Sequence, residues 1–168
     1  MTADANTHVT TDDASRFGNL NEWQAMLDRH AELFSEMVPG SAVGFVARSG
    51  SGIMPGKHAA GLKSAQGVGQ MLAWEVPPNS SGTAGMRASF RSYTGFEDTR
   101  VDLLFVAEDE ALQAMRAALD GDALTIIKRL IRKGPIMFYV MKNKYQLQDA
   151  GYEEFLDSLG LAFLGACR

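Results

Sequence analysis

The feature that most constrains the fold is a series of short β-strand patterns with no long helical pattern between them. The segments 42–48, 68–76, 86–93 and 99–107 are rich in apolar side chains or alternate apolar and polar ones. Parallel neighbours joined directly need a crossover of a dozen or more residues, usually a helix. We therefore expect an antiparallel sheet and not a doubly wound parallel one.

Two of these segments indicate where the sheet is exposed and where it is buried. In the segment 86–93, Met86, Ala88 and Phe90 point to one side and the polar residues between them to the other. Such alternation is typical of an antiparallel strand with one wet face. The segment 99–107 is apolar on both faces, which predicts a central strand.

A helix is predicted before the first strand. Asn21 is expected to cap it, with Gln24 three residues later completing a capping box, and Pro39-Gly40 is expected to stop it. An apolar stripe at helical spacing defines the buried side: Trp23, Met26, Leu27, His30, Leu33, Phe34 and Met37.

Helices also follow the last of these strands. Glu108 opens one helix, and Asp122 starts a second that runs to Gly134. A short helix is expected at 152–159, after Gly151. Between them lies the apolar run 135–141, for which the sequence leaves open whether Pro135 begins a helix or a strand.

Together these patterns predict an α+β fold. We expect an antiparallel sheet of about four to five strands, covered on one face by helices, and a helical C-terminal third. Residues 1–18 are polar and lack periodicity, so they are expected to form a disordered acidic tail. Residues 19–168 then form a single domain.

Composition excludes several classes of function. The chain has 168 residues and a net charge of −4, whereas a dedicated nucleic-acid binder is normally basic. No apolar run approaches the roughly 18 residues that span a bilayer. The start of the chain shows no signal-peptide pattern, and Cys167 has no cysteine to pair with, so we expect a cytoplasmic protein.

No motif indicates catalysis or metal binding. The histidines His8, His30 and His58 have no metal-ligand spacing. The glycine-rich segment 49–57 departs from the phosphate-loop pattern. We expect no metal, no cofactor and no catalytic residue. For the loop 49–67 the sequence leaves three roles open: a lid, part of a site, or a linker.

Residues 68–147 resemble the sterol-carrier-protein type two family in the order of their elements. The strand Val101 to Phe105, the helix Ala111 to Leu119, the basic-glycine element Ile131-Arg132-Lys133-Gly134 and the apolar segment Ile136 to Met141 follow the order of that family. The chain departs from the family at Pro135, where an acidic residue is usual, and in the helix before it. The resemblance implies a non-catalytic carrier whose apolar segment lines a lipid tunnel.

The leading functional prediction is therefore a binding or carrier module for an apolar or lipid-like ligand, with an anionic acyl group among the candidates. A cavity between the sheet and the C-terminal helices is expected, with two cations at its mouth for the anionic group. The predicted ligand-binding residues are Ile136, Phe138, Tyr139, Val140, Met141, Phe155, Leu159, Arg132 and Lys133.

A cationic face is predicted on the second of the late helices. Lys128, Arg129, Arg132 and Lys133 share one side of the helix. This side is either a solvated helix face or a surface for phospholipid headgroups, an acyl-CoA phosphate or an acidic partner. Peripheral contact with a membrane is expected through these residues if the second interpretation holds.

Two alternatives remain open. The protein is an accessory subunit of a larger, bacterial-type enzyme assembly if Leu161, Phe163 and Leu164 are exposed for a partner protein rather than closing the core. It is an enzyme if the loop 49–67, the arginines Arg87 and Arg91 and the carboxylate of Asp102 assemble one site.

Overall fold

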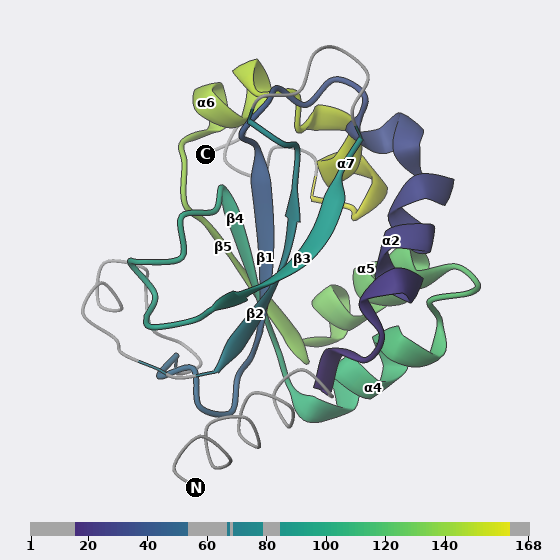
Figure 1. The fold of residues 1–168 in the computed structure, drawn as a ribbon, viewed down its shortest axis with the longest axis vertical. Helices are drawn as coiled ribbons and strands as arrows, with labels where there is room; N and C mark the ends of the chain where they lie inside the picture. Colours follow the sequence, from purple (N-terminus) through teal and green to yellow (C-terminus); the bar gives the residue numbers. More distant parts are fainter. Residues whose placement is uncertain (1–15, 54–66, 68, 79–84, 162–168) are drawn as a thin grey trace, which may run out of the picture.

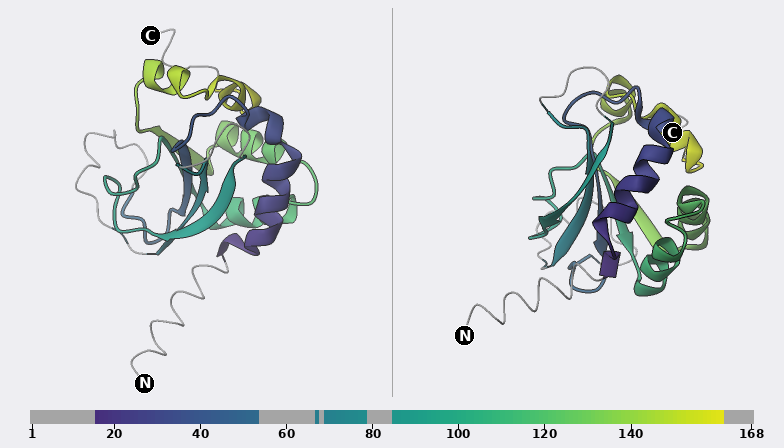
Figure 2. Two further views of the ribbon diagram at one scale, coloured as in Figure 1. Left: turned by 45° about the horizontal axis from the view of Figure 1, so that its top comes forward. Right: turned by 45° about the vertical axis from the view of Figure 1, so that its right-hand side comes forward.

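The computed structural model describes residues 16–53, 67, 69–78 and 85–161, which form one five-stranded sheet with helices on one side (Figure 1; Figure 2). The strands are β1 (Ala42–Ala47), β2 (Gln70–Glu75), β3 (Arg87–Ser92), β4 (Leu103–Ala107) and β5 (Ile136–Val140). The helices are α2 (Leu20–Arg29), the 3-10 turn η1 (Ala31–Phe34), α4 (Asp109–Ala117), α5 (Ala123–Lys133), α6 (Lys144–Asp149) and α7 (Glu153–Ser158). The predicted α+β architecture is confirmed.

The strand order is β3-β2-β1-β4-β5, and one pairing differs in direction from the rest. The pairs β1–β2, β2–β3 and β4–β5 are antiparallel as expected, but β1 and β4 are parallel. The segment between β1 and β4 contains β2 and β3, and it is long enough to return the chain to the other side of β1. Strands thus serve here as the crossover that usually contains a helix.

The helix side of the sheet carries a dense aromatic core. The ring of Phe45 lies 4.7 Å from that of Trp74 and 4.8 Å from that of Phe105, measured between centroids. Trp23 from α2 and Phe155 from α7 pack against the same group, and all five side chains are fully buried. The expectation that helices cover one face of the sheet is confirmed (Figure 2).

Loops cover much of the opposite face. Ile53, Phe96 and Val101 pack there against Met71 and Leu104, and all five side chains are buried. The solvent-exposed face that was expected for the 86–93 strand is thus present only at the edge of the sheet. There the side chains of β3 are partly exposed, because β3 lies at the edge of the sheet.

The start of α2 differs from the prediction. Asn19, not Asn21, is the N-cap, because its side chain accepts a hydrogen bond from the Asn21 N–H. Gln24 makes no capping box. Its side chain donates to the Met86 carbonyl at 3.0 Å and accepts from the Ala88 N–H at 2.8 Å, so it joins α2 to β3. The helix also ends earlier than expected, at Arg29 rather than near residue 38.

The folded part of the chain begins before residue 19. Phe17 is buried, and its carbonyl accepts a hydrogen bond of 2.6 Å from the Trp23 indole N–H. Residues 16–18, assigned to the tail from sequence, therefore pack with the domain. Residues 1–15 of the predicted tail lie outside the described residues.

The C-terminal third begins as predicted and contains one additional helix. Asp122 caps α5, since its side chain accepts from the Thr125 N–H. These hydrogen bonds from Thr125 lower the pKa of the Asp122 carboxyl. Gly134 ends α5 in the left-handed conformation, and Pro135 leads into a strand rather than a helix. The helix α6 was not predicted. In the part of the chain described, no helix combines the length and apolarity needed to span a membrane.

Candidate functional site

The apolar run 136–141 forms the edge strand β5, and its side chains divide between the two faces of the sheet. Ile136 and Phe138 pack on the helix side, whereas Tyr139 and Met141 pack on the opposite side. This division follows from the strand conformation, in which successive side chains point in opposite directions. The run therefore does not line one space. Phe138, Tyr139 and Met141 are half-buried, and Val140 is exposed.

Two further residues of the predicted lining lie in the interior. The ring of Phe155 lies 5.4 Å from that of Phe34, within the aromatic core. Leu159 is buried in the same cluster, as is Ile136. These three side chains fill the space between the sheet and the helices in which the cavity was expected. Ile136, Phe155 and Leu159 line none of the hollows described below.

The remaining two predicted residues, Arg132 and Lys133, line a hollow on the outside of α5. Its volume is about 480 Å³, and its other lining residues are Thr125, Lys128 and Arg129. All five side chains project from one side of α5, because residues three and four apart are neighbours on a helix. The apolar side of α5 faces inward, where Ile127 is fully buried. We call this hollow and its four cations the α5 face.

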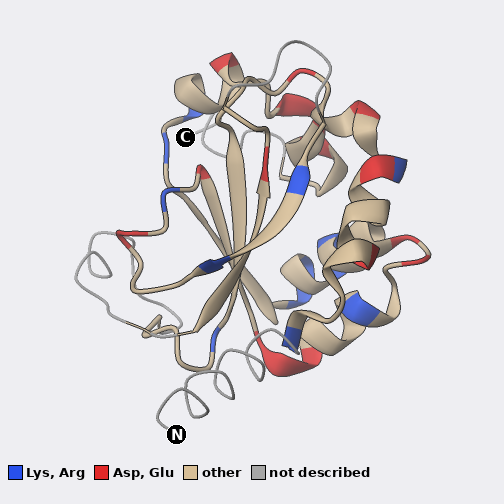
Figure 3. Ribbon diagram, in the orientation of Figure 1, with Lys and Arg blue, Asp and Glu red and all other residues tan. Residues whose placement is uncertain are grey.

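The cations of the α5 face have no counterions among the described residues. The described part of the chain contains two ion pairs, Arg91–Glu75 at 2.9 Å and Lys142–Asp102 at 3.5 Å. α5 itself carries no carboxylate, so its basic segments stand together in Figure 3. In a protein of net charge −4, this is a local concentration of positive charge.

The helix that carries the α5 face packs with its other side on β5, whose apolar side chains are partly exposed. α5 packs on β5, and Leu130, Ile131 and Phe138 are partly buried against the same core cluster. The Gly134 turn joins the two elements directly. Positive charge and accessible apolar surface thus occur within one α5–β5 unit.

Of the residues of the enzyme alternative, Arg91 and Asp102 lie at different strands of the sheet and make separate contacts. Arg91 pairs with Glu75 on the neighbouring strand β2, at the β3 edge of the sheet. Asp102 lies on the far side of β1, just before β4, in a different set of contacts. Most of the loop 49–67 lies outside the described residues.

Asp102 instead occupies a buried polar network. Its Oδ2 accepts a hydrogen bond of 2.6 Å from the Tyr152 hydroxyl and one of 3.2 Å from the Ala42 N–H. Burial raises the pKa of the Tyr152 hydroxyl, and its hydrogen bond to Asp102 raises it further. Tyr152 is therefore a permanent donor near neutral pH. The network links α7 to the starts of β1 and β4.

Two other tyrosines have a raised pKa for the same main reason. Burial raises the pKa of Tyr93 to about 12, and its hydroxyl donates to the Ser51 carbonyl at 2.7 Å. Burial also raises the pKa of Tyr139 on β5. Neither phenol is therefore set up as an acid-base catalyst near neutral pH.

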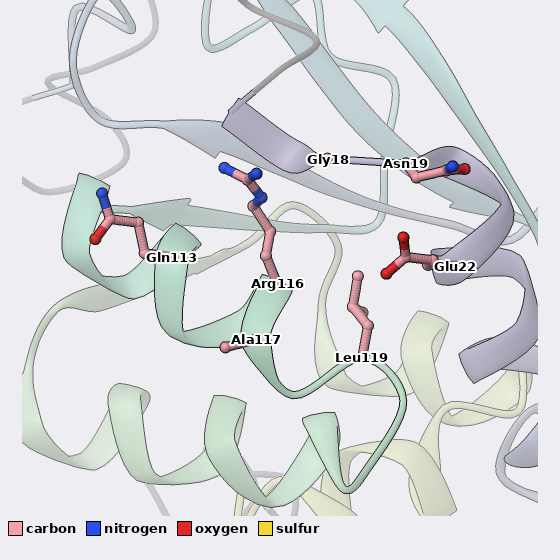
Figure 4. Close-up of a pocket in the computed structure, with 7 residues that line it drawn as sticks. All are labelled: Gly18, Asn19, Glu22, Gln113, Arg116, Ala117 and Leu119. Carbon is pink, nitrogen blue, oxygen red and sulfur yellow. The ribbon is translucent and has the colours of Figure 1, made fainter.

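A second hollow, which the sequence did not indicate, lies between the start of α2 and the end of α4. Its volume is about 410 Å³. Figure 4 shows Arg116 on α4 pointing toward the start of α2 at Gly18, with the Glu22 carboxylate on the α2 wall. Neither charge is in an ion pair with a described residue. The residues come from segments about ninety positions apart, so no local motif marks them.

A third hollow, of about 490 Å³, lies where β1 ends and α4 begins. Arg48 lines it together with Glu108, Asp109 and Glu110. The Nε of Arg48 is buried and has no hydrogen-bond partner among the described residues. Within the described ranges, no three or more His, Cys, Asp or Glu side chains, these carboxylates included, are placed so that they could hold a metal ion together.

Residue Leu161 bears on the accessory-subunit alternative. Leu161 is buried in the main core, which agrees with the interpretation that this segment closes the core. Phe163 and Leu164 lie outside the described residues. Within the described part of the chain, the segment thus contributes to the core rather than to an exposed surface.

Comparison with known proteins finds similarity at the level of structure. No model of a protein family matches the chain, and no curated protein matches it. A solved structure named UbiJ-SCP2 ubiquinone synthesis protein is similar over 89% of this chain and 88% of its own, with 12% identity and a TM-score of 0.36. A conserved hypothetical protein from Thermus thermophilus, whose name suggests a sterol carrier protein, is similar over 87% of each chain, with 10% identity and a TM-score of 0.39.

Both names agree with the family that the sequence resembles.

Proposed function

We propose that the protein is a non-catalytic binding or carrier module for a lipid-like ligand with an anionic headgroup. The observation that carries this proposal is the α5 face, where four cations without described counterions surround one hollow. The half-buried apolar side chains of β5 lie in the adjoining element. An anionic amphiphile matches both properties.

The α5 face has the chemistry to hold a phosphate or a carboxylate. Lys128 and Arg132 are four residues apart, as are Arg129 and Lys133, so two pairs of cations lie on one side of the helix. The two guanidinium groups can each bind an oxyanion through two parallel hydrogen bonds. The volume of the hollow lies within the range of small-molecule sites.

The apolar part of the ligand is assigned to the outer part of the β5 edge. Phe138 and Val140 point to the helix side of the sheet, and both retain accessible surface. Ile136, Phe155 and Leu159 are left out of the proposed ligand contact, because their side chains are buried in the core. The proposed site is thus an open surface and not a closed tunnel.

The α5 face can meet a headgroup in two settings, either on a free amphiphile or in a lipid bilayer. The chemistry is the same, since both present phosphate or carboxylate oxygens. Both interactions are expected to weaken with salt, because exposed charges are screened within about 10 Å at 0.1 M salt. Two parallel titrations distinguish the settings: one with monomeric dodecyl phosphate, and one with phosphatidylcholine vesicles containing phosphatidylserine.

The test compares two variants that lose the same charge. In Arg129→Gln/Arg132→Gln, we expect the affinity for dodecyl phosphate to fall about tenfold or more, because charge-assisted hydrogen bonds are lost. In the control Arg87→Gln/Arg116→Gln, both arginines are exposed and lie outside the α5 face, and we expect an unchanged affinity. Isothermal titration calorimetry measures both.

Two results would contradict the proposal. One is the absence of saturable binding of dodecyl phosphate or anionic vesicles to the unaltered protein. The other is an equal loss of affinity in the control variant, which would indicate a nonspecific response to net charge. Native mass spectrometry of the purified protein gives an independent reading, since a carrier is expected to retain or exchange an amphiphile.

A further inference from the structure

The large apolar side chains that are exposed gather around α6. Among the described residues these are Val38, Val140 and Tyr145, with exposed fractions of 43%, 45% and 66%. Val140 lies shortly before α6, and Tyr145 is in its first turn. The Val38 N–H donates to the Ala150 carbonyl at the other end of α6. Figure 1 shows α6 at one end of the sheet, beyond β5.

Lysines accompany the apolar residues at the start of α6. The amine of Lys144 lies 4.9 Å from the centroid of the Tyr145 ring, and Lys142 is an exposed residue between β5 and α6. A complete capping box between Asn143 and Gln146 holds this turn in place. We call Val140, Lys142, Lys144 and Tyr145 the α6 tip.

We propose that the α6 tip docks on an anionic membrane surface, with Tyr145 and Val140 at the depth of the lipid headgroups. Tyrosine is enriched at membrane–water interfaces, where its ring is apolar and its hydroxyl is hydrated. Lys144 beside it adds a positive charge that attracts anionic lipids, whereas the amine of Lys142, although exposed, is paired with Asp102 at 3.5 Å. This surface shares no residue with the α5 face, although Val140 also belongs to the β5 edge assigned to the apolar part of the ligand. The inference rests on Tyr145 and Lys144 and does not depend on the proposed function.

The composition of the tip favours a bilayer over a protein partner. Protein interfaces have cores depleted in lysine, with contiguous apolar surface. Here Lys142 and Lys144 stand between the exposed apolar side chains of Val140 and Tyr145, which suits a hydrated, negatively charged interface. The nearby exposed acidic residues Glu36 and Asp149 lie toward the other end of α6, because Gly151 adjoins the Glu36 carbonyl. The docking side is therefore the start of α6.

A tryptophan placed in the tip reports its environment directly. In Tyr145→Trp the new indole occupies an exposed position, whereas the native Trp23 and Trp74 are fully buried. With vesicles of phosphatidylcholine and phosphatidylserine, we expect the emission of residue 145 to shift to the blue and to be quenched by brominated lipid. The matched control is Gln113→Trp, at an exposed position of α4, which is expected to stay unshifted.

The contribution of charge is tested in the same background. Adding Lys144→Gln is expected to weaken partitioning into the anionic vesicles about fivefold, the value for one lysine near such a surface. Pure phosphatidylcholine vesicles are expected to give little or no shift. The variant Arg129→Gln/Arg132→Gln is expected to leave the signal of residue 145 in place, which separates this inference from the proposed function.

Three outcomes would overturn the inference. In the first, the emission of residue 145 keeps its aqueous position at saturating anionic lipid. In the second, the Gln113→Trp control shifts equally. In the third, residue 145 shifts with protein concentration and without lipid, which would assign the α6 tip to contact between copies of the chain.

Discussion

At the scale of single residues, the contact between Tyr152 and Asp102 joins the start of α7 to the start of β4, fifty positions earlier in the chain. The hydroxyl of Tyr152 is fully buried, and it donates to a carboxylate that also accepts the Ala42 N–H. Hydrogen bonds to charged groups contribute more to stability than neutral ones. Removing the Tyr152 hydroxyl leaves the buried carboxylate of Asp102 with one hydrogen bond fewer. Leaving a buried charged group without a partner lowers stability more than removing both partners together.

The variant Tyr152→Phe tests this contact. We expect the free energy of unfolding to fall by about 2 kcal/mol, since a charge-assisted hydrogen bond is lost from a buried site. The matched control is Tyr145→Phe, in which an exposed hydroxyl is removed and no change is expected. Urea denaturation followed by circular dichroism measures both. Equal midpoints for Tyr152→Phe and the unaltered protein would contradict the expected role.

The raised pKa of Tyr93 predicts a loss of stability at alkaline pH. An unfolded tyrosine releases its proton near pH ~10, whereas Tyr93 in the folded protein does so only at about 12. Between these values the unfolded state binds fewer protons, so stability falls as pH rises. The stabilisation is complete below pH ~10 and is lost as pH approaches the folded value.

Urea midpoints measured from pH 8 to pH ~11 check this dependence. Tyr93→Phe is expected to be less stable at pH 8, because it loses the hydrogen bond to Ser51, but to lose less stability per pH unit above ~10. The pH dependence of stability that remains in Tyr93→Phe is assigned in part to Tyr152, whose pKa is also raised. Identical slopes for the variant and the unaltered protein would exclude the contribution of Tyr93.

Residue-level prediction from the sequence succeeded where the contact is local. Asp122 caps α5 through Thr125, three positions later, as expected. Gln24 was assigned to a local capping box, but its partners lie on β3, more than sixty positions away. A local sequence pattern cannot distinguish a glutamine that caps its own helix from one that bonds to a distant strand. In both cases the residue stands at the same distance from the start of the helix.

At the scale of elements, the strands and the longer helices were predictable because their periodicity is strong. The helix α6 was not, since only Leu147 among its six residues is buried and such a short pattern has no visible stripe. The parallel pairing of β1 and β4 could not be predicted either. It depends on the side of β1 to which the chain returns, and the alternation of side chains in a strand does not indicate that side.

The glycines that end helices give a matched pair of predictions. Both Gly134 and Gly151 have a positive φ, of 110° and 85°. An added Cβ at Gly134 meets nothing within 4 Å, so Gly134→Ala is expected to cost only the backbone strain, about 1 kcal/mol. At Gly151 the Cβ would overlap the backbone of Glu36.

We therefore expect Gly151→Ala to cost ~3 kcal/mol, because the steric overlap adds to the backbone strain. Thermal unfolding of the two variants under one set of conditions measures the difference. Similar melting temperatures for Gly134→Ala and Gly151→Ala would show that α7 can move away from residue 36 without loss.

At the scale of the whole molecule, the helix side of the sheet is a packed aromatic core. Aromatic and methionine-rich sequence is common to dense cores and to lipid cavities, so composition could not distinguish them. The predicted lining was drawn from one run of sequence, but a strand sends its neighbours to opposite faces. Of the nine predicted residues, only Arg132 and Lys133 line one of the hollows described above. The position of that pair on one side of α5 was predictable because helical spacing is readable from sequence.

The packing of Phe155 predicts a large effect on stability. We expect Phe155→Ala to lower the free energy of unfolding by 3–5 kcal/mol, about the value for a buried aromatic residue. Phe138→Ala, at a half-buried position, is expected to cost ~1–2 kcal/mol. Chemical denaturation of purified protein measures both. Equal costs, or a stable Phe155→Ala variant, would indicate that the space around α7 is loosely filled.

The hydrogen bond from Tyr152 to Asp102 spans fifty positions, and the same hydroxyl lies 3.2 Å from the carbonyl of Ala42, 110 positions away. A ribosome releases these partners in order, so the first strand leaves it long before the tyrosine does. Until Tyr152 has been synthesised, the nascent chain lacks the hydroxyl that donates to Asp102. A contact that secures the starts of β1 and β4 is therefore completed only when the residue that precedes α7 has left the ribosome.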